Sequence, residues 1–350
     1  MRFEFRKYLT IPFVCTALLF GCGERETPAG PEYAHLELAG QWDSPGYATD
    51  VAVAGDYAYL ADDQAGFHVI NITDPANPEL VGTYGTSYGG VTILDVAPSI
   101  NLLAIVNNRN AQYYYNITNP DSLSLYDGSG GSTQTNDLLT RGIPSESGSD
   151  SLMLFMGDSN DGVRFSLYEA FEFGGLISWA GIASSETQDT LTRGRALGLS
   201  LDGLLLLSAQ DQLGLVLYDY TNFRANPAPR LRSFLDTPGS ARNVATRDSL
   251  AYIADGRFGL QIIAYDNPDS LEWLSGVEVP GYANDIAVSG QYVCLATGDG
   301  GSVLLDVSTP TAPAVVSQYT SPYTNAVTAS GDVFLVADRD AGLLLFRITN

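Results

Sequence analysis

The feature that most constrains this chain is a short apolar segment that recurs seven times. Each copy begins with glycine or alanine and continues with mostly aliphatic, β-branched and aromatic residues, which favour extended backbone. The copies are Gly66–Ile72, Ala111–Ile117, Gly162–Tyr168, Gly214–Tyr220, Gly259–Tyr265, Gly301–Val307 and Gly342–Ile348. Their starts lie 45, 51, 52, 45, 42 and 41 residues apart. A period of this length indicates a repeat architecture such as a propeller or a solenoid.

Each repeat contains four short strand-like segments and no helical period. In the first repeat they are Asp50–Ala54, Tyr57–Ala61, Phe67–Ile72 and Glu79–Tyr84. Four antiparallel strands make one propeller blade. The sequence therefore predicts an all-β fold, a seven-bladed β-propeller of four-stranded antiparallel blades.

Turn residues recur in step with these strands. A glycine precedes the second strand of four repeats, where a tight hairpin favours positive φ. These glycines are Gly55, Gly203, Gly290 and Gly331. A proline follows the third strand of four repeats, where it ends the strand and prepares a turn. These prolines are Pro75, Pro120, Pro268 and Pro310.

Two segments carry a more specific resemblance. Val69–Gly82 and Val303–Pro313 resemble the LVIVD repeat, a β-propeller repeat of bacterial surface and secreted proteins. The resemblance covers nearly all of residues 34–350 and is weakest in the third repeat, where Gly128–Ser132 and Ser145–Asp150 enlarge the loops. It implies a fold and an interaction role rather than a reaction.

The two ends of the repeat region complement each other. The seventh repeat stops after its third strand, and Leu36–Trp42 is similar to the fourth-strand segments Leu80–Tyr84 and Val315–Tyr319. We therefore expect residues 34–42 to supply the missing outer strand of the last blade. Such a strand would protect two sheet edges and close the ring.

The N-terminus has the features of a bacterial lipoprotein signal. Basic residues precede a short apolar run from Leu9 to Phe20, which is too short to span a bilayer. Leu19–Cys22 resembles a lipobox, which implies a signal peptide over residues 1–21 and lipidation of Cys22. Residues 22–33 are polar and contain Pro and Gly, as expected of a flexible tether. Gly23 favours the outer membrane or the cell surface over inner-membrane retention.

Composition narrows the classes of partner. The formal net charge of −23 argues against binding of nucleic acid and against electrostatic docking on anionic lipid. With Cys22 acylated, Cys294 is the one remaining thiol, so no disulfide is expected. Two histidines, His35 and His68, offer no zinc constellation. We expect no cofactor, with Ca²⁺ as the alternative considered below.

The loop entering each inner strand and the loop between strands two and three should emerge on one face, because neighbouring strands run in opposite directions. These loops collect tyrosines, carboxylates, amides and arginines, with Arg193 and Arg339 nearby. The candidate binding residues at this channel mouth are Tyr47, Asp50, Arg195, Arg242, Asn243, Arg257, Tyr282, Asp285, Tyr323 and Asn325.

Two interpretations of these residues remain open. Propellers often bind ligands at the central mouth, where polar and aromatic groups converge. Alternatively, Asp50, Asn243, Asp285 and Asn325 bond backbone at the start of their strands, as short polar side chains do. Their repetition favours the second interpretation. The tyrosines are equally consistent with ligand binding and with packing.

Three functions are compatible with the sequence. The first is a non-enzymatic, lipid-anchored envelope protein whose propeller is a rigid surface for an unknown protein or glycan. The second is a Ca²⁺-dependent, lactonase-like hydrolase that uses carboxylates at the channel mouth, since carboxylate and amide oxygens suit Ca²⁺. The third is a structural member of an envelope complex.

Other chemical motifs are weak. Asp158–Gly162 and Asp338–Gly342 bring acids close to glycine, but neither has the spacing of an EF-hand, so hairpin turns are expected. Gly85–Gly89 matches the esterase pattern G-x-S-x-G without the strand, turn and helix that it requires. We assign no catalytic residue.

Overall fold

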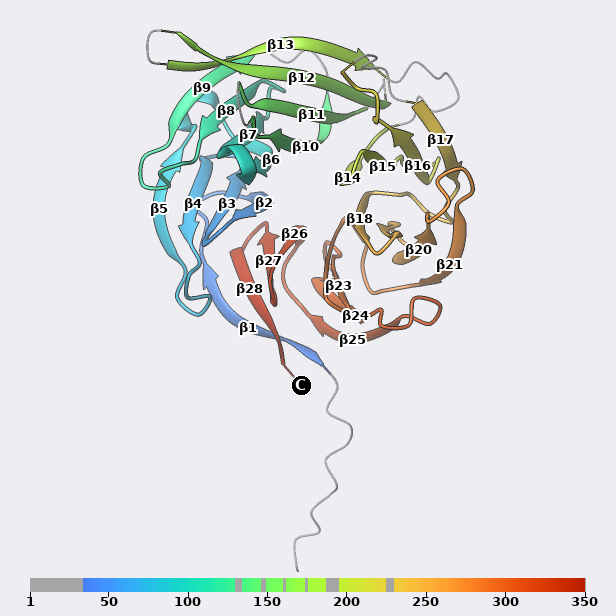
Figure 1. The fold of residues 1–350 in the computed structure, drawn as a ribbon. Helices are drawn as coiled ribbons and strands as arrows, with labels where there is room; N and C mark the ends of the chain where they lie inside the picture. Colours follow the sequence, from blue (N-terminus) through green and yellow to red (C-terminus); the bar gives the residue numbers. More distant parts are fainter. Residues whose placement is uncertain are drawn as a thin grey trace, which may run out of the picture. The chain divides into compact units, whose positions relative to one another are not determined.

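The computed structural model describes residues 34–129, 134–145, 149–159, 162–173, 176–186, 195–224 and 230–349. In these residues the strands form seven four-stranded antiparallel sheets arranged around a central axis (Figure 1). The predicted seven-bladed propeller is confirmed. The signal, Cys22, the tether and Arg193 lie outside the described residues.

The first three blades follow the chain order from the axis outward. Blade one contains β2 (Ala48–Ala54), β3 (Tyr57–Asp62), β4 (Gly66–Asn71) and β5 (Glu79–Tyr84). Blade two contains β6 (Val91–Ala97), β7 (Leu102–Asn107), β8 (Gln112–Asn116) and β9 (Ser124–Ser129). Blade three contains β10 (Thr135–Ile143), β11 (Ser151–Asp158), β12 (Gly162–Phe173) and β13 (Leu176–Glu186).

The next three blades repeat this order. Blade four contains β14 (Gly198–Asp202), β15 (Leu205–Ala209), β16 (Leu215–Asp219) and β17 (Arg230–Leu235). Blade five contains β18 (Asn243–Arg247), β19 (Leu250–Ala254), β20 (Leu260–Ala264) and β21 (Glu272–Val277). Blade six contains β22 (Asp285–Ser289), β23 (Tyr292–Ala296), β24 (Ser302–Asp306) and β25 (Ala314–Tyr319).

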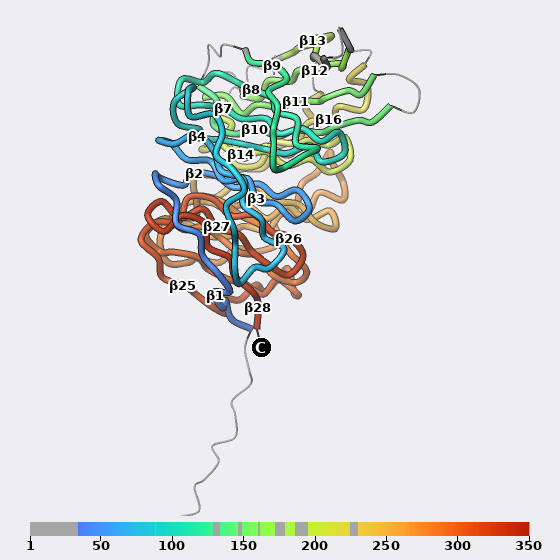
Figure 2. The backbone as a smooth tube through the Cα atoms, turned by 90° about the vertical axis from the view of Figure 1, so that its left-hand side faces the viewer, coloured from blue at the N-terminus to red at the C-terminus, as the bar shows by residue number. Residues whose placement is uncertain are grey.

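Blade seven closes the ring as the sequence predicts. It contains β26 (Thr324–Ser330), β27 (Val333–Asp338) and β28 (Gly342–Thr349), and its outer strand is β1 (His35–Trp42). The two strands pair antiparallel from His35 opposite Thr349 to Trp42 opposite Leu343. Figures 1 and 2 show β1 and β28 side by side from two directions. The clasp at residues 34–42 is therefore confirmed.

The hairpin glycines have the predicted conformation. Gly55, Gly203, Gly290 and Gly331 have φ of 58°, 61°, 53° and 60°. A Cβ at any of the four would meet no atom within 4 Å, so backbone conformation rather than space selects glycine. Asn101 and Ser249 adopt positive φ at the corresponding hairpins of blades two and five, at 50° and 59°.

The core lies between neighbouring blades. Every residue of β7, β11 and β27 is buried, because the middle strands of a blade are covered on both faces by the adjacent sheets. This burial explains why these strands are nearly continuous apolar runs rather than alternating ones. In the part of the chain that the structure describes, no helix has the length and apolarity that a membrane span requires.

Blade three departs from the other blades, as expected from its enlarged loops. Its outer strands β12 and β13 have 12 and 11 residues, whereas the outer strands of blades one, five and six have six. Figure 1 shows this hairpin extending across the outside of blade two. Residues 130–133 and 146–148, which belong to the enlarged loops, lie outside the described residues.

Candidate functional site

The two sets of loops named in the sequence lie on one face, as expected. The amide N of Asp63 donates to the Tyr47 carbonyl at 3.1 Å, and the amide N of Arg339 donates to the Tyr323 carbonyl at 2.8 Å. Gly256 forms a bridge with Ala283 of the next blade. Entry loops and second-to-third loops therefore hold each other at one end of the channel.

A cavity of about 300 Å³ opens at this end. Its lining consists of Thr49, Asp50, Thr92, Ile93, Asn136, Asp137, Leu197, Arg242, Asn243, Asn284, Asp285, Tyr323, Asn325 and Ala326. Strand register shows that these residues come from two successive positions at the start of each inner strand, with Tyr323 added; blade four contributes only Leu197. The first position holds Thr49, Thr92, Asn136, Leu197, Arg242, Asn284 and Asn325. The second holds Asp50, Ile93, Asp137, Gly198, Asn243, Asp285 and Ala326.

Asn325 differs from the sequence-based grouping. We grouped it with Asp50, Asn243 and Asp285, but Ala326 is the residue opposite Ala337, as Asp50 is opposite Ala61. The register shift between Thr324 and Ala326 has a counterpart between Ala48 and Asp50, so Asn325 corresponds to Thr49. Its Nδ2 donates to the Ala48 carbonyl of the next blade at 2.7 Å.

The carboxylates of the second position join neighbouring blades. Asp50 Oδ1 accepts from the amide N of Val51 at 2.8 Å, and its Oδ2 accepts from the amide N of Leu94 in blade two at 2.9 Å. Asp137 accepts in the same way from Leu138 at 2.8 Å and from Leu199 in blade four at 2.7 Å. Each side chain thus satisfies backbone N–H groups of two blades.

The pattern continues on blades five and six. Asn243 Oδ1 accepts from the amide N of Val244 at 2.7 Å, and its Nδ2 donates to Asp285 Oδ1. Asp285 Oδ2 accepts from the amide N of Val327 in blade seven at 2.7 Å. The interpretation of these residues as backbone-bonding groups is therefore supported, with bonds that reach the next blade.

Blade two uses a carboxylate two residues further along its inner strand. Asp95 Oδ2 accepts from the amide N of Thr140 in blade three at 2.5 Å and from the Thr140 hydroxyl at 2.7 Å. Ile93 takes the channel position that Asp50 has in blade one. The hydrogen bonds between blades two and three are therefore formed by a residue two positions further along the inner strand.

These carboxyl groups are weakly acidic. Burial raises the pKa of Asp50 from 3.8 to about 6 and the pKa values of Asp95 and Asp285 to about 7. Burial also raises the pKa of Asp137 well above its usual value, and the charges of Asp50 and Asp285 add to that rise. The side chains are partly exposed to the channel, but surrounding protein leaves little water to solvate a negative charge.

Three polar residues of the cavity have hydrogen-bonding groups without partners among the described residues. Nε of Arg242 is buried and has no hydrogen-bond partner among the described residues. Likewise, nothing in the described residues pairs with the Asn284 side-chain amide or hydrogen-bonds the Tyr323 hydroxyl. These three residues belong to blades five, six and seven, which are adjacent (Figure 1). The cavity therefore has one side in which hydrogen-bonding capacity is unused.

A scan of family models finds the LVIVD repeat at residues 45–86, 238–272 and 280–321. The chain carries LVIVD repeats. The matched segments contain the inner strands of blades one, five and six, and with them Asp50, Arg242, Asn243 and Asp285. The search of curated proteins found no match.

Solved propellers share the fold of this LVIVD-repeat chain at low sequence identity. One match is to a chain of the crystal structure of the mitotic checkpoint complex, with a TM-score of 0.67 and 14% identity over 97% of this chain and 100% of that one. Another is the β-propeller domain of Cps50 (Swd1) from Myceliophteria thermophila, with a TM-score of 0.66 and 12% identity over 90% of this chain and 100% of that one. These likenesses show the fold alone.

Four of the predicted binding residues lie around the cavity rather than in its lining. The Tyr47 side chain is 44% exposed, and Tyr282 lies beside Gly256. Arg257 is exposed at a loop tip. Arg195 is 51% exposed and lies 3.9 Å from an oxygen of Asp211. Asp50, Arg242, Asn243, Asp285, Tyr323 and Asn325 form part of the lining.

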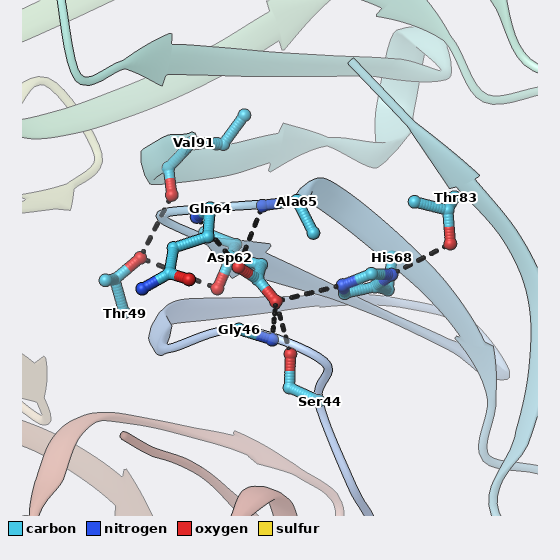
Figure 3. Close-up of polar contacts among 10 residues, drawn as sticks. Ser44, Gly46, Thr49, Asp62, Gln64, Ala65, His68, Thr83 and Val91 are labelled. Carbon is cyan, nitrogen blue, oxygen red and sulfur yellow. Dashed lines mark hydrogen bonds and ion pairs between the residues drawn. The ribbon is translucent and has the colours of Figure 1, made fainter. Parts of the chain in front are cut away.

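Carboxylates at the ends of second strands fix the loops on this face of the propeller. Asp62 is fully buried, and its two oxygens accept hydrogen bonds from Ser44, Gly46, Gln64 and Ala65 at 2.6 to 3.0 Å (Figure 3). Asp338 Oδ1 similarly accepts from the amides of Asp340 and Ala341 at 3.0 and 2.9 Å. The hairpin interpretation of Asp338–Gly342 is therefore supported.

His68 belongs to the same network. Its Nε2 lies 3.3 Å from Asp62 Oδ2, and its Nδ1 lies 2.9 Å from the Thr83 hydroxyl (Figure 3). The centroid of the Trp42 ring, in the clasp, lies 4.9 Å from that of the His68 ring. The contacts with His68 and with backbone N–H groups hold the pKa of Asp62 well below its usual range despite burial. From the sequence, His68 was predicted only as a strand residue.

The chemical alternatives find little support in the geometry. The segment Gly85–Gly89 contains a short 3₁₀ helix, η1 (Thr86–Tyr88), instead of a nucleophile elbow; a second, η2 (Pro98–Ile100), follows β6. Among the described residues, no group of three or more His, Cys, Asp or Glu side chains is arranged to hold a metal ion. Cys294 is buried in β23, where burial raises its pKa.

Five polar residues of the lining were not among the predicted binding residues: Thr49, Thr92, Asn136, Asp137 and Asn284. Asn136 Nδ2 donates to the Ala196 carbonyl at 2.9 Å, which parallels the bond of Asn325. The signal for Asp137 was its alignment with Asp50 at the start of an inner strand, but the long loop before it hid the correspondence. Asn284 directly precedes Asp285 and was treated as part of the entry loop.

Proposed function

We propose that this protein is a non-enzymatic, lipid-anchored cell-envelope protein whose propeller binds a glycan at the channel mouth. The observation that carries the proposal is the cavity of about 300 Å³, to which all seven blades contribute. That volume lies at the lower end of the range for small-ligand pockets. It suits one sugar unit better than a protein surface.

The chemistry of the cavity supports a carbohydrate ligand. Its lining is rich in amide and hydroxyl groups, which suit the hydroxyls of a sugar. Tyr323 lines the cavity, while Tyr282 and the exposed Tyr47 lie on the surrounding loops. Tyrosine offers an apolar ring face together with a polar tip.

The bonds between blades support a preformed site. Asp50, Asp137 and Asp285 each link an inner strand to the next one by short hydrogen bonds. Because these links fix the backbone around the cavity, ligand binding would cost little conformational entropy of the protein. Preorganisation of this kind favours binding by a rigid surface.

The cellular location is part of the proposal. Leu19–Cys22 resembles a lipobox, so we propose removal of residues 1–21, lipidation of Cys22 and a tether over residues 22–33. The outer membrane or the cell surface is the proposed site. Replacing Cys22→Ser should move the protein from the membrane fraction to the soluble fraction. An unchanged membrane fraction would contradict the anchor.

A glycan array with the purified domain of residues 34–350 tests the binding function. Asn284→Phe should fill the cavity without breaking a hydrogen bond, so binding should be lost while the thermal transition stays in place. Asp332→Phe places the same side chain in an exposed turn of blade seven outside the cavity lining and should leave binding intact. Absence of any glycan binding, or binding that survives Asn284→Phe, would overturn the proposal.

The same assay addresses the Ca²⁺-dependent hydrolase. Binding should be equal with Ca²⁺ and with a chelator, and the bound glycan should be recovered uncleaved. A requirement for Ca²⁺ together with cleavage products would favour the hydrolase instead.

A further inference from the structure

Arg242 is the one of the three unpaired residues that can only donate hydrogen bonds, whereas the Asn284 amide and the Tyr323 hydroxyl can donate or accept. The carboxylates of the same cavity are already acceptors for backbone N–H groups, as the bonds of Asp50 and Asp137 show. A ligand that complements Arg242 must therefore bring acceptors, and Asn284 and Tyr323 can donate to the same ligand.

Arg242 is the one charged residue at the first of the two lining positions. The corresponding residues are Thr49, Thr92, Asn136, Leu197, Asn284 and Asn325, all uncharged. Thr49, Asn136 and Asn325 donate to backbone carbonyls at 3.2, 2.9 and 2.7 Å, respectively. Arg242 has no ion pair among the described residues, and its buried Nε has no acceptor there. A buried donor without an acceptor is costly, so a partner supplied by a ligand would relieve that cost.

We propose that the cavity takes the carboxylate of an acidic sugar, held by the Arg242 guanidinium with the Asn284 amide and the Tyr323 hydroxyl beside it. This inference rests on the proposed glycan-binding function and specifies its ligand. A guanidinium presents a planar fork of N–H groups that matches the two oxygens of a carboxylate. The guanidinium of Arg339 lies over the Tyr323 ring, 4.9 Å from its centroid, so Tyr323 would contribute through its hydroxyl.

The acids around the cavity are compatible with such a ligand. The titratable groups at the channel are Asp50, Asp95, Asp137 and Asp285, together with Arg242 and Tyr323. Burial raises the pKa of all four acids, so each takes up a proton more readily than an exposed aspartate. The negative charge opposing the ligand is smaller than the number of carboxyl groups would indicate.

Calorimetric titration of residues 34–350 with methyl glucuronide and with methyl glucoside tests the inference. The two sugars differ in the carboxylate, so the glucuronide should bind about 10- to 100-fold more tightly. Arg242→Met should remove that preference. Arg230→Met is the matched control, because Arg230 is an exposed arginine of the outer strand β17 outside the lining, and it should change nothing.

Two further measurements test whether the sugar and the guanidinium geometry, and not the charges alone, account for binding. Triglycine presents a carboxylate without a sugar and should bind at least about 10-fold more weakly than the glucuronide. Arg242→Lys keeps the charge but loses the fork, and it should recover only part of the preference. Thermal unfolding of each variant confirms that it is folded.

The outcomes distinguish this inference from the function on which it rests. Equal affinity for glucoside and glucuronide would overturn the carboxylate inference while leaving glycan binding intact. Triglycine binding as tightly as the glucuronide would overturn the sugar and leave a carboxylate site. If Arg242→Met keeps the preference, the assigned residue is wrong. Absence of binding both here and on the glycan array would overturn the proposed function itself.

Discussion

Two groups of residues at the channel mouth serve different purposes. Asp50, Asp137 and Asp285 accept hydrogen bonds from backbone N–H groups of the following blade, and we call them the structural side. Arg242, Asn284 and Tyr323 form no side-chain hydrogen bond with any described residue, and we call them the ligand side. The structural side holds the blades together, and the ligand side is available to a ligand.

The difference shows why repetition alone does not identify a site. Acids and amides that recur at equivalent positions, as Asp50, Asn243 and Asp285 do, form the hydrogen bonds that join neighbouring blades. A residue that departs from this pattern and has no hydrogen-bond partner in the described residues does not contribute to joining the blades. Arg242 is such a residue at a position where the other blades have neutral side chains.

Opening the ring should have the largest effect, because both sides of the mouth depend on closure. Deleting residues 34–42 removes β1, exposes the edge of β28 and loses the burial of Leu36. Several apolar side chains and the strand pairing are lost together, so the free energy of unfolding should fall by more than about 4 kcal/mol. Denaturant unfolding measures the change.

The control for that deletion is a chain that starts at Ala34 and keeps β1. It should unfold at the same denaturant concentration as the chain that starts at Gly23. If loss of residues 34–42 left the midpoint unchanged, closure by this strand would not matter for stability.

Breaking one link on the structural side should have the next largest effect. Asp50→Ala leaves the amide N–H groups of Val51 and Leu94 without their acceptor. The free energy of unfolding should fall by about 1 to 3 kcal/mol, the range for a buried donor left unsatisfied. Chemical denaturation at about pH 6 checks this. A variant as stable as the parent would mean that the link contributes nothing.

The raised pKa values predict an unusual pH dependence. Folding moves the pKa of Asp50 from 3.8 to about 6 and those of Asp95 and Asp285 to about 7, so the folded state holds more protons than the unfolded state between about pH 4 and 7. Stability should therefore fall as pH rises through this window. One pKa unit corresponds to about 1.4 kcal/mol, so the total change should exceed 1 kcal/mol.

Thermal unfolding at a series of pH values measures this slope. Asp285→Asn removes one of the contributing groups and should flatten the curve. Below about pH 4 the trend should reverse, because Asp62 has a lowered pKa and its stabilising bonds are lost on protonation. Rising stability between about pH 4 and 7 would contradict the assignment of proton uptake to the channel acids.

Changes on the ligand side should have the smallest effect on stability. Arg242→Met and Asn284→Ala break no hydrogen bond within the described residues. Neither should lower the free energy of unfolding by more than about 0.5 kcal/mol, and Arg242→Met should raise it slightly because it removes a buried donor without an acceptor. A large loss in the same denaturation assay would show that these side chains support the fold.

The fold followed closely from the sequence because each blade repeats the same local rules. Four short strands, a positive-φ glycine such as Gly55 and a proline such as Pro75 define the unit. The chain ends leave β28 without a partner, which only a segment like Leu36–Trp42 can provide. Agreement between strand pattern, turn chemistry and closure made the topology predictable.

The site was less predictable because it depends on register and on contacts between blades. Asp50, Arg242, Asn243, Asp285, Tyr323 and Asn325 were expected at the mouth, and all line the cavity. Asn325 was assigned one position too late because it is the polar residue next to Ala326; the shared register shift of β2 and β26 shows that it corresponds to Thr49. It also could not show which side chains already have partners. The buried contact of His68 with Asp62 joins residues whose approach depends on the loop between their strands.

The most direct test of the two-sided mouth is to measure stability and glucuronide affinity for Asp50→Ala and Arg242→Met in parallel. Asp50→Ala should lower the free energy of unfolding by about 1 to 3 kcal/mol and retain the preference for the glucuronide. Arg242→Met should keep the parent's stability and lose that preference. The opposite pattern, with Arg242→Met destabilised and Asp50→Ala stable but unable to discriminate the sugars, would contradict the division of roles.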